Sequence, residues 1–336
     1  MRERTHWSMV ALLVGGMTAA VASLRLHGAS ASLAPQIEKT PSGRLSIGTN
    51  AQPCTFVADA TGTPVPVAEY QRIVSGSSIA DAILPDLVST ERIVGVSSWY
   101  ADKNPQAARL SGKRHVSGLY DLERVVSLRP DLVIVSNYSA DPGPIERLRE
   151  RGIPVFDLGS MLGQRTLERN LRDLGRLLKQ PVQAEQVAQQ FHRRMSQVAA
   201  HVPPNSRKRA LYVNLYDTQL HGGTLGSSYY DVLTAAGLLD VAAIGRREGE
   251  RGSAAWPRYR PEDLLQMDPD VIVTIRGKGK LICAMSGLER LKACRTSGGV
   301  LELDEWQLND PGPGMLGASE VLCDLAYPTS KAAMGS

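Results

Sequence analysis

The sequence has few of the features that mark specialised classes of protein. Aromatic residues make up only 5% of the 336 residues, and the four cysteines are too few for a disulfide scaffold. Long heptads and a regular glycine repeat are absent, which excludes coiled coils and collagen. A net charge of +4 with 43% hydrophobic residues excludes a disordered chain, and the length indicates two domains. Short basic runs without interleaved aromatics give no support for nucleic-acid binding.

The N-terminus has the pattern of a secretory signal peptide. Arg2 and Arg4 precede an apolar run over Met9–Leu24, which is followed by a small-residue stretch ending at Ala31. The run is shorter than the ~20 apolar residues that span a bilayer. We therefore expect residues 1–31 to be a signal peptide cleaved after Ala31, with Ala22 as a second possible site. Neither site has a nearby cysteine, so we expect a soluble, exported protein without a lipid anchor.

Export places the four cysteines in an oxidising compartment. Cys54, Cys283, Cys294 and Cys323 could form one or two disulfides, and four cysteines allow three full pairings. The sequence does not choose among these pairings. It contains no C-x-x-C motif and no histidine close to a cysteine pair, so a zinc site is not predicted.

An internal repeat indicates the architecture. Residues 122–135 and 261–274 share a glutamate, a proline and an aspartate at matching places, 139 positions apart. Each copy reads as a short amphipathic helix that ends before proline and is followed by a β-branched strand. A Gly-Ser-Ser turn followed by an aspartate also occurs twice, at Asp81 and at Asp231, 150 positions apart. Two matches in the same order predict a duplicated α/β unit.

Apolar strands of this kind favour parallel sheets covered by helices on both faces. We therefore predict two Rossmann-like α/β lobes with mostly parallel sheets, joined by one long helix, with a ligand cleft between them. A helix over 181–201, about 30 Å long at 1.5 Å per residue, would permit only small closure motions. Residues 61–64 predict a hairpin turn at the edge of the first lobe. The predicted segments are 1–31 (signal peptide), 32–54 (linker), 55–163 (first lobe), 164–206 (connecting helices), 207–330 (second lobe) and 331–336 (tail).

Aromatic residues follow several predicted strands. Ligands of parallel α/β sheets bind beyond the carboxyl ends of the strands, and flat rings can stack on a planar ligand. An arginine among them can pair with a carboxylate or a phosphate. Packing at the rims of the lobes is the alternative role for each aromatic residue. The three tryptophans are read as loop residues. The candidate ligand-binding residues are Trp99, Tyr100, Tyr138, Tyr216, Trp256, Arg276 and Trp306.

No catalytic residue, resident metal or cofactor is predicted. His115 and His221 each stand alone in a predicted loop, where an imidazole is either a polar loop residue or a metal ligand. The sequence lacks the G-x-S-x-G, H-E-x-x-H and G-x-G-x-x-G motifs and a complete P-loop. An exported enzyme on a two-lobed scaffold remains the alternative to a binding protein.

Over residues 55–328 the sequence resembles the periplasmic proteins that deliver metal chelates to ABC importers. The resemblance rests on residues 72–78, 92–98, 121–133, 152–155 and 270–273 in this order. It implies two α/β lobes on one rigid helix and a ferric siderophore, haem or a cobalamin-type corrinoid as ligand. Trp256, six residues before Glu262, and Trp306 resemble positions of cobalamin binders, whereas Pro313-Gly314 and residues 115–120 depart from the pattern.

The resemblance also implies how the protein is used. A glutamate from each lobe, here Glu123 and Glu262, would dock into arginine pockets on the paired membrane subunits of the importer. A carboxylate at a helix N-terminus is favoured by the helix dipole and can pair with a guanidinium through both oxygens. The alternative is that each glutamate only stabilises the start of its helix. The expected receptor is a periplasmic monomer.

Overall fold

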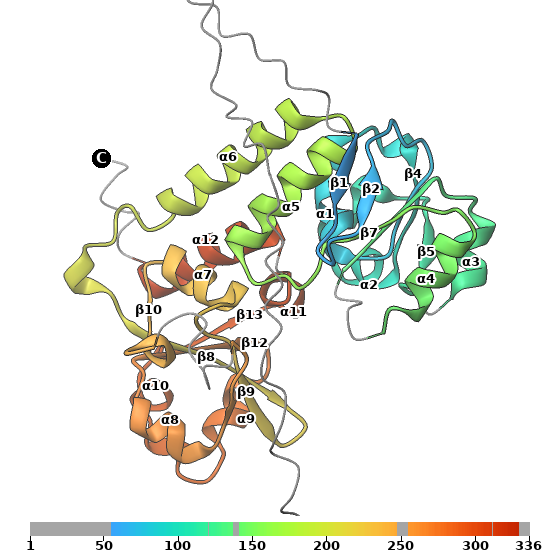
Figure 1. Ribbon diagram of the computed structural model, residues 1–336. Coiled ribbons are helices and arrows are strands. Elements are labelled where there is room, and N and C mark those ends of the chain that lie inside the picture. The colour runs from blue at the N-terminus through green and yellow to red at the C-terminus, as the bar shows by residue number, and fades with distance from the viewer. Residues whose placement is uncertain (1–54, 120, 137–140, 247–254, 311, 329–336) are drawn as a thin grey trace, which may run out of the picture. The chain divides into compact units, whose positions relative to one another are not determined.

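The computed structural model describes residues 55–328, apart from residues 120, 137–140, 247–254 and 311 (Figure 1). The predicted signal peptide, Cys54, Tyr138 and the predicted tail lie outside the described residues. None of the helices within the described ranges is both long enough and apolar enough to cross a membrane.

A fully parallel sheet organises the first half of the described chain. Its strands are β3 (Ile73–Ser75), β4 (Ile93–Ser97), β5 (Arg114–Val116), β6 (Leu132–Val135) and β7 (Val155–Asp157), in the order β5-β4-β3-β6-β7. The helices around it are α1 (Ser78–Leu87), α2 (Ser98–Lys103), α3 (Leu122–Ser127) and α4 (Gly143–Glu150). Apolar side chains of α1 and α2 share a core with one face of the sheet, and those of α3 and α4 with the other. Both faces are therefore covered, as the buried strand β6 predicted.

The predicted turn over residues 61–64 is confirmed, but its strands do not extend this sheet. Strands β1 (Phe56–Ala58) and β2 (Pro64–Pro66) form a separate antiparallel pair. Asp59 holds the pair in place: its side chain is fully buried and accepts hydrogen bonds from the backbone N–H groups of Thr61 and Thr63, each at 2.9 Å. Arg149 of α4 completes the contact with an ion pair of 2.9 Å to the same carboxylate. The hairpin is thus fastened to the first half by side chains.

The second half contains a mixed sheet. Its strands are β8 (Arg209–Tyr216), β9 (Gln219–Gly222), β10 (Leu239–Asp240), β11 (Arg258–Tyr259), β12 (Val271–Ile275) and β13 (Val300–Leu303). Its helices are α7 (Ser228–Ala235), α8 (Pro261–Met267), α9 (Gly279–Cys283), α10 (Lys292–Arg295), α11 (Glu305–Leu308) and α12 (Gly314–Ala326). Strands β8, β10, β12 and β13 pair in parallel, whereas β9 and β11 are antiparallel additions. Helices α7 and α12 cover one face, and α8, α9 and α10 cover the other.

The duplication read from the sequence is confirmed by the strand order. The series β4-β3-β6-β7 in the first sheet corresponds to β10-β8-β12-β13 in the second. The repeated aspartates make equivalent contacts, because Asp131 accepts the backbone N–H of Arg72 and Asp270 accepts that of Arg209, at the starts of β3 and β8. Each carboxylate therefore ties the start of one strand to the start of its neighbour.

Two helices connect the halves. Helix α5 (Gln164–Leu177) packs along α6 (Pro181–Gln197), and α6 also contacts α1 of the first half and α7 and α12 of the second. In Figure 1, α5 and α6 are coloured yellow-green, because they follow the first half and precede the second half in the sequence. Proline at the first position suits the start of a helix, and the predicted start at Pro181 is confirmed. The helix ends at Gln197, four residues before the predicted end.

One disulfide joins two short helices of the second half. Cys283 and Cys294 are bonded, with their Cα atoms 5.6 Å apart, and they link α9 to α10. Cys323 is a buried free thiol. Its Sγ lies 3.5 Å from the carbonyl oxygen of Val198, so it packs α12 against the end of the connecting helix.

Candidate ligand-binding site

The described candidates lie at the ends of strands, but not all of them are loop residues. Trp99 is in α2, directly after β4, and Trp306 is in α11, after β13, so the loop prediction is wrong for both. Tyr216 is the last residue of β8, and Arg276 directly follows β12. Each of these four residues lies at or beyond the carboxyl end of a parallel strand, where such sheets bind ligands.

Trp256 reaches the same sheet by a different route. It precedes the antiparallel strand β11, and its neighbours Ala255 and Pro257 accept hydrogen bonds from the backbone of Thr224 and Gly222, at 2.9 and 2.8 Å. The segment with Trp256 therefore runs beside the end of β9. Trp256 is 50% exposed, so about half of its surface is available for contact.

Strand β9 places a histidine beside Tyr216. The rings of Tyr216 and His221 meet edge to face, with centroids 5.6 Å apart, and His221 lies opposite Arg258 of β11. Tyr216, His221 and Trp256 thus belong to one antiparallel corner of the second sheet. His115 is placed elsewhere, on β5, with Nδ1 4.0 Å from Oδ1 of Asp102. The part of the chain that the structure describes contains no group of three His, Cys, Asp or Glu side chains that could hold a metal ion.

Arg276 already has a partner within the protein. Its Nε donates to Oδ1 of Asp304 at 2.6 Å, and both side chains are exposed. This ion pair joins the ends of β12 and β13. An anionic group of a ligand would have to compete with Asp304 for the guanidinium.

Tyr100 differs from its predicted role as a surface contact. It is only 3% exposed and packs in the core of the first half. Burial, and then the nearby carboxylates of Asp310 and Asp81, raise the pKa of Tyr100 above its ordinary value. Tyr100 therefore packs α2 against the core, while its neighbour Trp99 is exposed.

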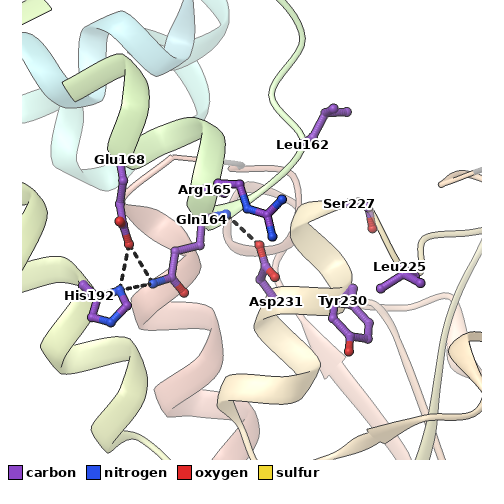
Figure 2. A pocket seen from close by; sticks show the side chains of 10 residues that line it. Leu162, Gln164, Arg165, Glu168, His192, Leu225, Ser227, Tyr230 and Asp231 are labelled. Carbon is purple, nitrogen blue, oxygen red and sulfur yellow. Dashed lines mark hydrogen bonds and ion pairs between the residues drawn. The ribbon is translucent and has the colours of Figure 1, made fainter. Parts of the chain in front are cut away.

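A polar pocket lies where α5 begins. A cavity of about 340 Å³ lies between the start of α5, helix α6 and the start of α7, and Figure 2 shows the side chains that line it. Its lining residues are Leu162, Gln164, Arg165, Glu168, His192, Leu225, Gly226, Ser227, Tyr230 and Asp231. The mixture of both charges with two leucines suits a small polar group attached to a larger ligand.

Asp231 of α7 caps α5 across this pocket. Helix α5 has no capping side chain of its own, and the backbone N–H of Gln164 donates to Oδ2 of Asp231 at 2.6 Å (Figure 2). Gly163 before it has φ +115°, and a Cβ at this position would collide with the same oxygen. Only glycine fits both the backbone and the cap. The sequence singled out Asp231 as a repeat position but not this contact.

On the opposite wall, a histidine joins the two connecting helices. Nδ1 of His192 is 3.0 Å from Oε1 of Glu168, which also accepts Nε2 of Gln164 at 2.8 Å (Figure 2). Sequence reasoning missed these residues because they carry no motif. Their only signal was a position on helices that were expected to connect the halves.

The halves also meet through a buried hydrogen bond. Nδ2 of Asn104 donates to Oδ2 of Asp310 at 3.3 Å, and both residues are buried. The backbone N–H of Gly312 binds the other oxygen at 2.8 Å. Burial raises the pKa of Asp310 to about 6, although these hydrogen bonds oppose the shift.

The repeated glutamates occupy equivalent places. Glu123 and Glu262 are both the second residue of their helix, α3 and α8, and both are exposed. The capping is done by other side chains, because Asp121 accepts the N–H of Arg124 and Asp263 accepts that of Arg260. A helix-capping role for the glutamates is therefore not needed.

Comparison with known proteins finds curated relatives over much of the chain. A cobalamin-binding protein of Halobacterium salinarum is 26% identical over 275 residues, covering 77% of this chain and 71% of that protein. A vitamin B12-binding protein of Salmonella typhimurium is 28% identical over 189 residues, covering 56% of this chain and 67% of the relative.

Solved structures show the same fold at lower identity. A periplasmic haem-binding protein from Roseiflexus has a TM-score of 0.63 at 20% identity, over 77% of this chain and 99% of that one. The molybdate-binding periplasmic protein of Haemophilus influenzae has a TM-score of 0.65 at 19% identity, over 83% and 93%. The family model described as periplasmic binding protein matches residues 73–285, more than half of the chain. The chain belongs to the periplasmic binding protein family.

Proposed function

We propose that this protein is a periplasmic receptor that binds a metal chelate and delivers it to an ABC importer. One observation carries the proposal: the carboxyl ends of both duplicated sheets carry exposed aromatic side chains. Trp99 follows β4 in the first half, and Tyr216 ends β8 in the second, with Trp256 on the neighbouring antiparallel segment. Flat rings on two sides suit a large, planar, partly apolar ligand.

A cobalamin-type corrinoid is the first ligand to test, ahead of haem and ferric siderophores. The curated relatives described above are named for cobalamin and vitamin B12, and their matches extend over more than half of this chain. A chelate brings its metal already coordinated, so the protein can recognise the rim of the chelate. Polar groups on that rim match the mixed charges of the pocket in Figure 2.

Titration calorimetry on protein secreted to the periplasm and purified tests this function. Cyanocobalamin, haem and a panel of ferric siderophores are titrated separately, and one class should bind with one site per chain. Failure of all three classes to bind would contradict a chelate receptor. Conversion of a bound compound, rather than its retention, would favour an exported enzyme.

Delivery would use the exposed glutamates Glu123 and Glu262. Each begins a repeated helix, so each half offers one carboxylate in an equivalent setting, without a capping role. An arginine on each of two paired membrane subunits could then bind one carboxylate through two hydrogen bonds. One monomer carries both contacts, so no second copy of the receptor is required.

A further inference from the structure

A second cavity lies beside α6 and shares no lining residue with the pocket of Figure 2. Its volume is about 470 Å³. One wall comes from the end of α1 and from the 3-10 helix η2 (Pro105–Leu110), and the opposite wall from α11 and α12, with α6 between them. Elements of both halves therefore surround the same space.

The cavity has an aromatic wall. The ring of Trp306 lines it and is only partly buried, beside the buried Phe191 of α6 and Pro313. Trp306 was predicted to face the cleft with Trp99 and Trp256, and the structure places it in the lining of this cavity, between elements of both halves. A partly exposed indole in a concave site offers one flat face for stacking.

The floor of the cavity contains a glycine inside a helix. Gly317 is the fourth of the thirteen residues of α12, and within a helix glycine is less favourable than alanine. Outside its own helix turn, no atom of the described residues lies within 4 Å of the position that its Cβ would take. Close packing therefore does not require glycine here. Its absent side chain leaves the floor of the cavity open.

The charged groups around the cavity already neutralise each other. Arg194 of α6 pairs with Glu320 of α12 at 2.8 Å, and Asp86 of α1 pairs with Arg109 at 2.7 Å. The remaining polar lining consists of the amides Gln106, Gln183 and Gln190. An amide offers both donors and acceptors, so this lining suits an uncharged polar group better than an ion.

We propose that this cavity is a second binding site, which takes an uncharged planar ring compound bearing an amide-like group. The ring stacks on Trp306 over Gly317, and its polar group exchanges hydrogen bonds with the glutamine amides. Because the walls come from both halves, an occupant contacts both halves at once. The proposal does not depend on which chelate binds in the main site.

Three compounds of nearly equal shape test the charge preference: benzamide is neutral, benzoate is an anion and benzamidinium is a cation. The protein is labelled with 5-fluorotryptophan, and the fluorine resonances are assigned with Trp99→Phe, Trp256→Phe and Trp306→Phe variants. Benzamide should shift the Trp306 resonance in a saturable way and leave the other two in place. The two ions should bind at least about tenfold more weakly, because the charged side chains of the lining are already paired and leave neither ion a free partner.

Two substitutions at one position provide the matched control. Gly317→Leu fills the floor and should weaken benzamide binding at least about tenfold, whereas Gly317→Ala adds one methyl group and should keep most of the affinity. Chelate affinity should be unchanged in both, which separates this proposal from the proposed function. If Gly317→Leu does not fold, Trp306→Ala followed by saturation-transfer signals of benzamide replaces it. An unmoved Trp306 resonance, equal binding of the three compounds or unaltered binding to these variants would overturn the proposal.

Discussion

The two halves of the described chain share a turn but use its aspartate differently. Asp81 in the first half accepts the backbone N–H of Ser97 at 3.0 Å and its hydroxyl at 2.6 Å, at the end of the neighbouring strand. Asp231, at the equivalent place in α7, reaches the N–H of Gln164 at the start of α5. The first aspartate binds its own half, and the second joins its half to the connecting helices. The duplication therefore gives each half an aspartate at the same place in the fold, but it does not determine which group that carboxylate binds.

The halves also differ at the edge of their sheets. The first sheet is parallel from β5 to β7, whereas the second carries the antiparallel strands β9 and β11 beside β8. Tyr216, His221 and Trp256 gather on this additional corner, while the first half offers Trp99 in a short helix after β4. The aromatic contacts of the second half therefore come largely from the part that is not duplicated.

The largest predicted effect is on chelate uptake, and it should follow from removing the exposed glutamates, at which the halves are most alike. The double variant Glu123→Ala/Glu262→Ala should lose most chelate uptake in cells that carry the importer, because both carboxylates needed for docking are removed. Each single variant should retain part of the uptake, and the two should be similar. Radiolabelled uptake measures this effect.

Melting temperature and chelate affinity are the controls for these variants. Both should stay close to wild type, since Asp121 and Asp263 perform the capping. Normal uptake by the double variant would rule out docking through these residues.

The next largest effect should be a loss of chelate affinity when an exposed tryptophan is removed. Trp99→Ala and Trp256→Ala should each weaken chelate binding by about 5- to 150-fold, which corresponds to the roughly 1–3 kcal/mol of one stacked aromatic ring. Calorimetry on the folded variants measures it. Equal losses would mean that both halves hold the ligand, and a loss for one alone would assign binding to that half. Wild-type affinity in both would refute the aromatic site.

Stability should depend on pH through the first half's aspartate. Burial raises the pKa of Asp81 from 3.8 to about 7, so the folded protein binds more protons than the unfolded chain between these values. Its contribution to the free energy of unfolding is complete below pH 4 and is lost as the pH rises to 7, by up to about 1.4 kcal/mol per pH unit. Asp310, with a pKa raised to about 6, acts in the same direction.

Urea unfolding of wild type and Asp81→Asn between about pH 4 and pH 8 measures this dependence. The variant should lose less stability than wild type as the pH rises, because an amide does not ionise. Adding Asp310→Asn should flatten the curve further. Parallel curves for wild type and the double variant would show that these carboxyls are not the source.

The smallest effect is expected for the cap that joins the second half to α5. Asp231→Ala should lower the free energy of unfolding by about 0.5–2 kcal/mol, the usual cost of losing a helix cap. Asp231→Asn keeps an oxygen acceptor and should cost less. Thermal melts of both variants compare the two, and an alanine variant as stable as wild type would show that the contact contributes nothing.

Much of the fold could be predicted from the sequence because the chain contains an internal repeat. The aspartate pair Asp131 and Asp270 marks the strand starts, and proline at 181 marks a helix start, so these features appear in the sequence as well as in the structure. The corner made by β9 and β11 was not predicted. It lies outside the repeat, and its short strands lack the long apolar runs by which parallel strands are recognised.

The site was less predictable than the fold. Sequence position placed Trp99 and Arg276 after strands, which the structure bears out, whereas Tyr216 is the last residue of its strand. Sequence position could not give the direction of a side chain. Tyr100 turns into the core and Trp306 lines the cavity beside α6. Both belong to short helices, in which neighbouring side chains point about 100° apart, so a one-residue error in the helix start changes the surface reached.

The cap on α5 can form only after α7 has been synthesised. The ribosome makes the start of α5 before it makes Asp231, and 67 positions separate the donor Gln164 from its acceptor. Until that later segment arrives, the first turn of the helix lacks its side-chain acceptor, and its free N–H groups must bind water. A truncated chain that ends before α7 would therefore carry an incomplete connecting helix. The first turn of α5 therefore gains its cap only once α7 has been synthesised and has packed beside it.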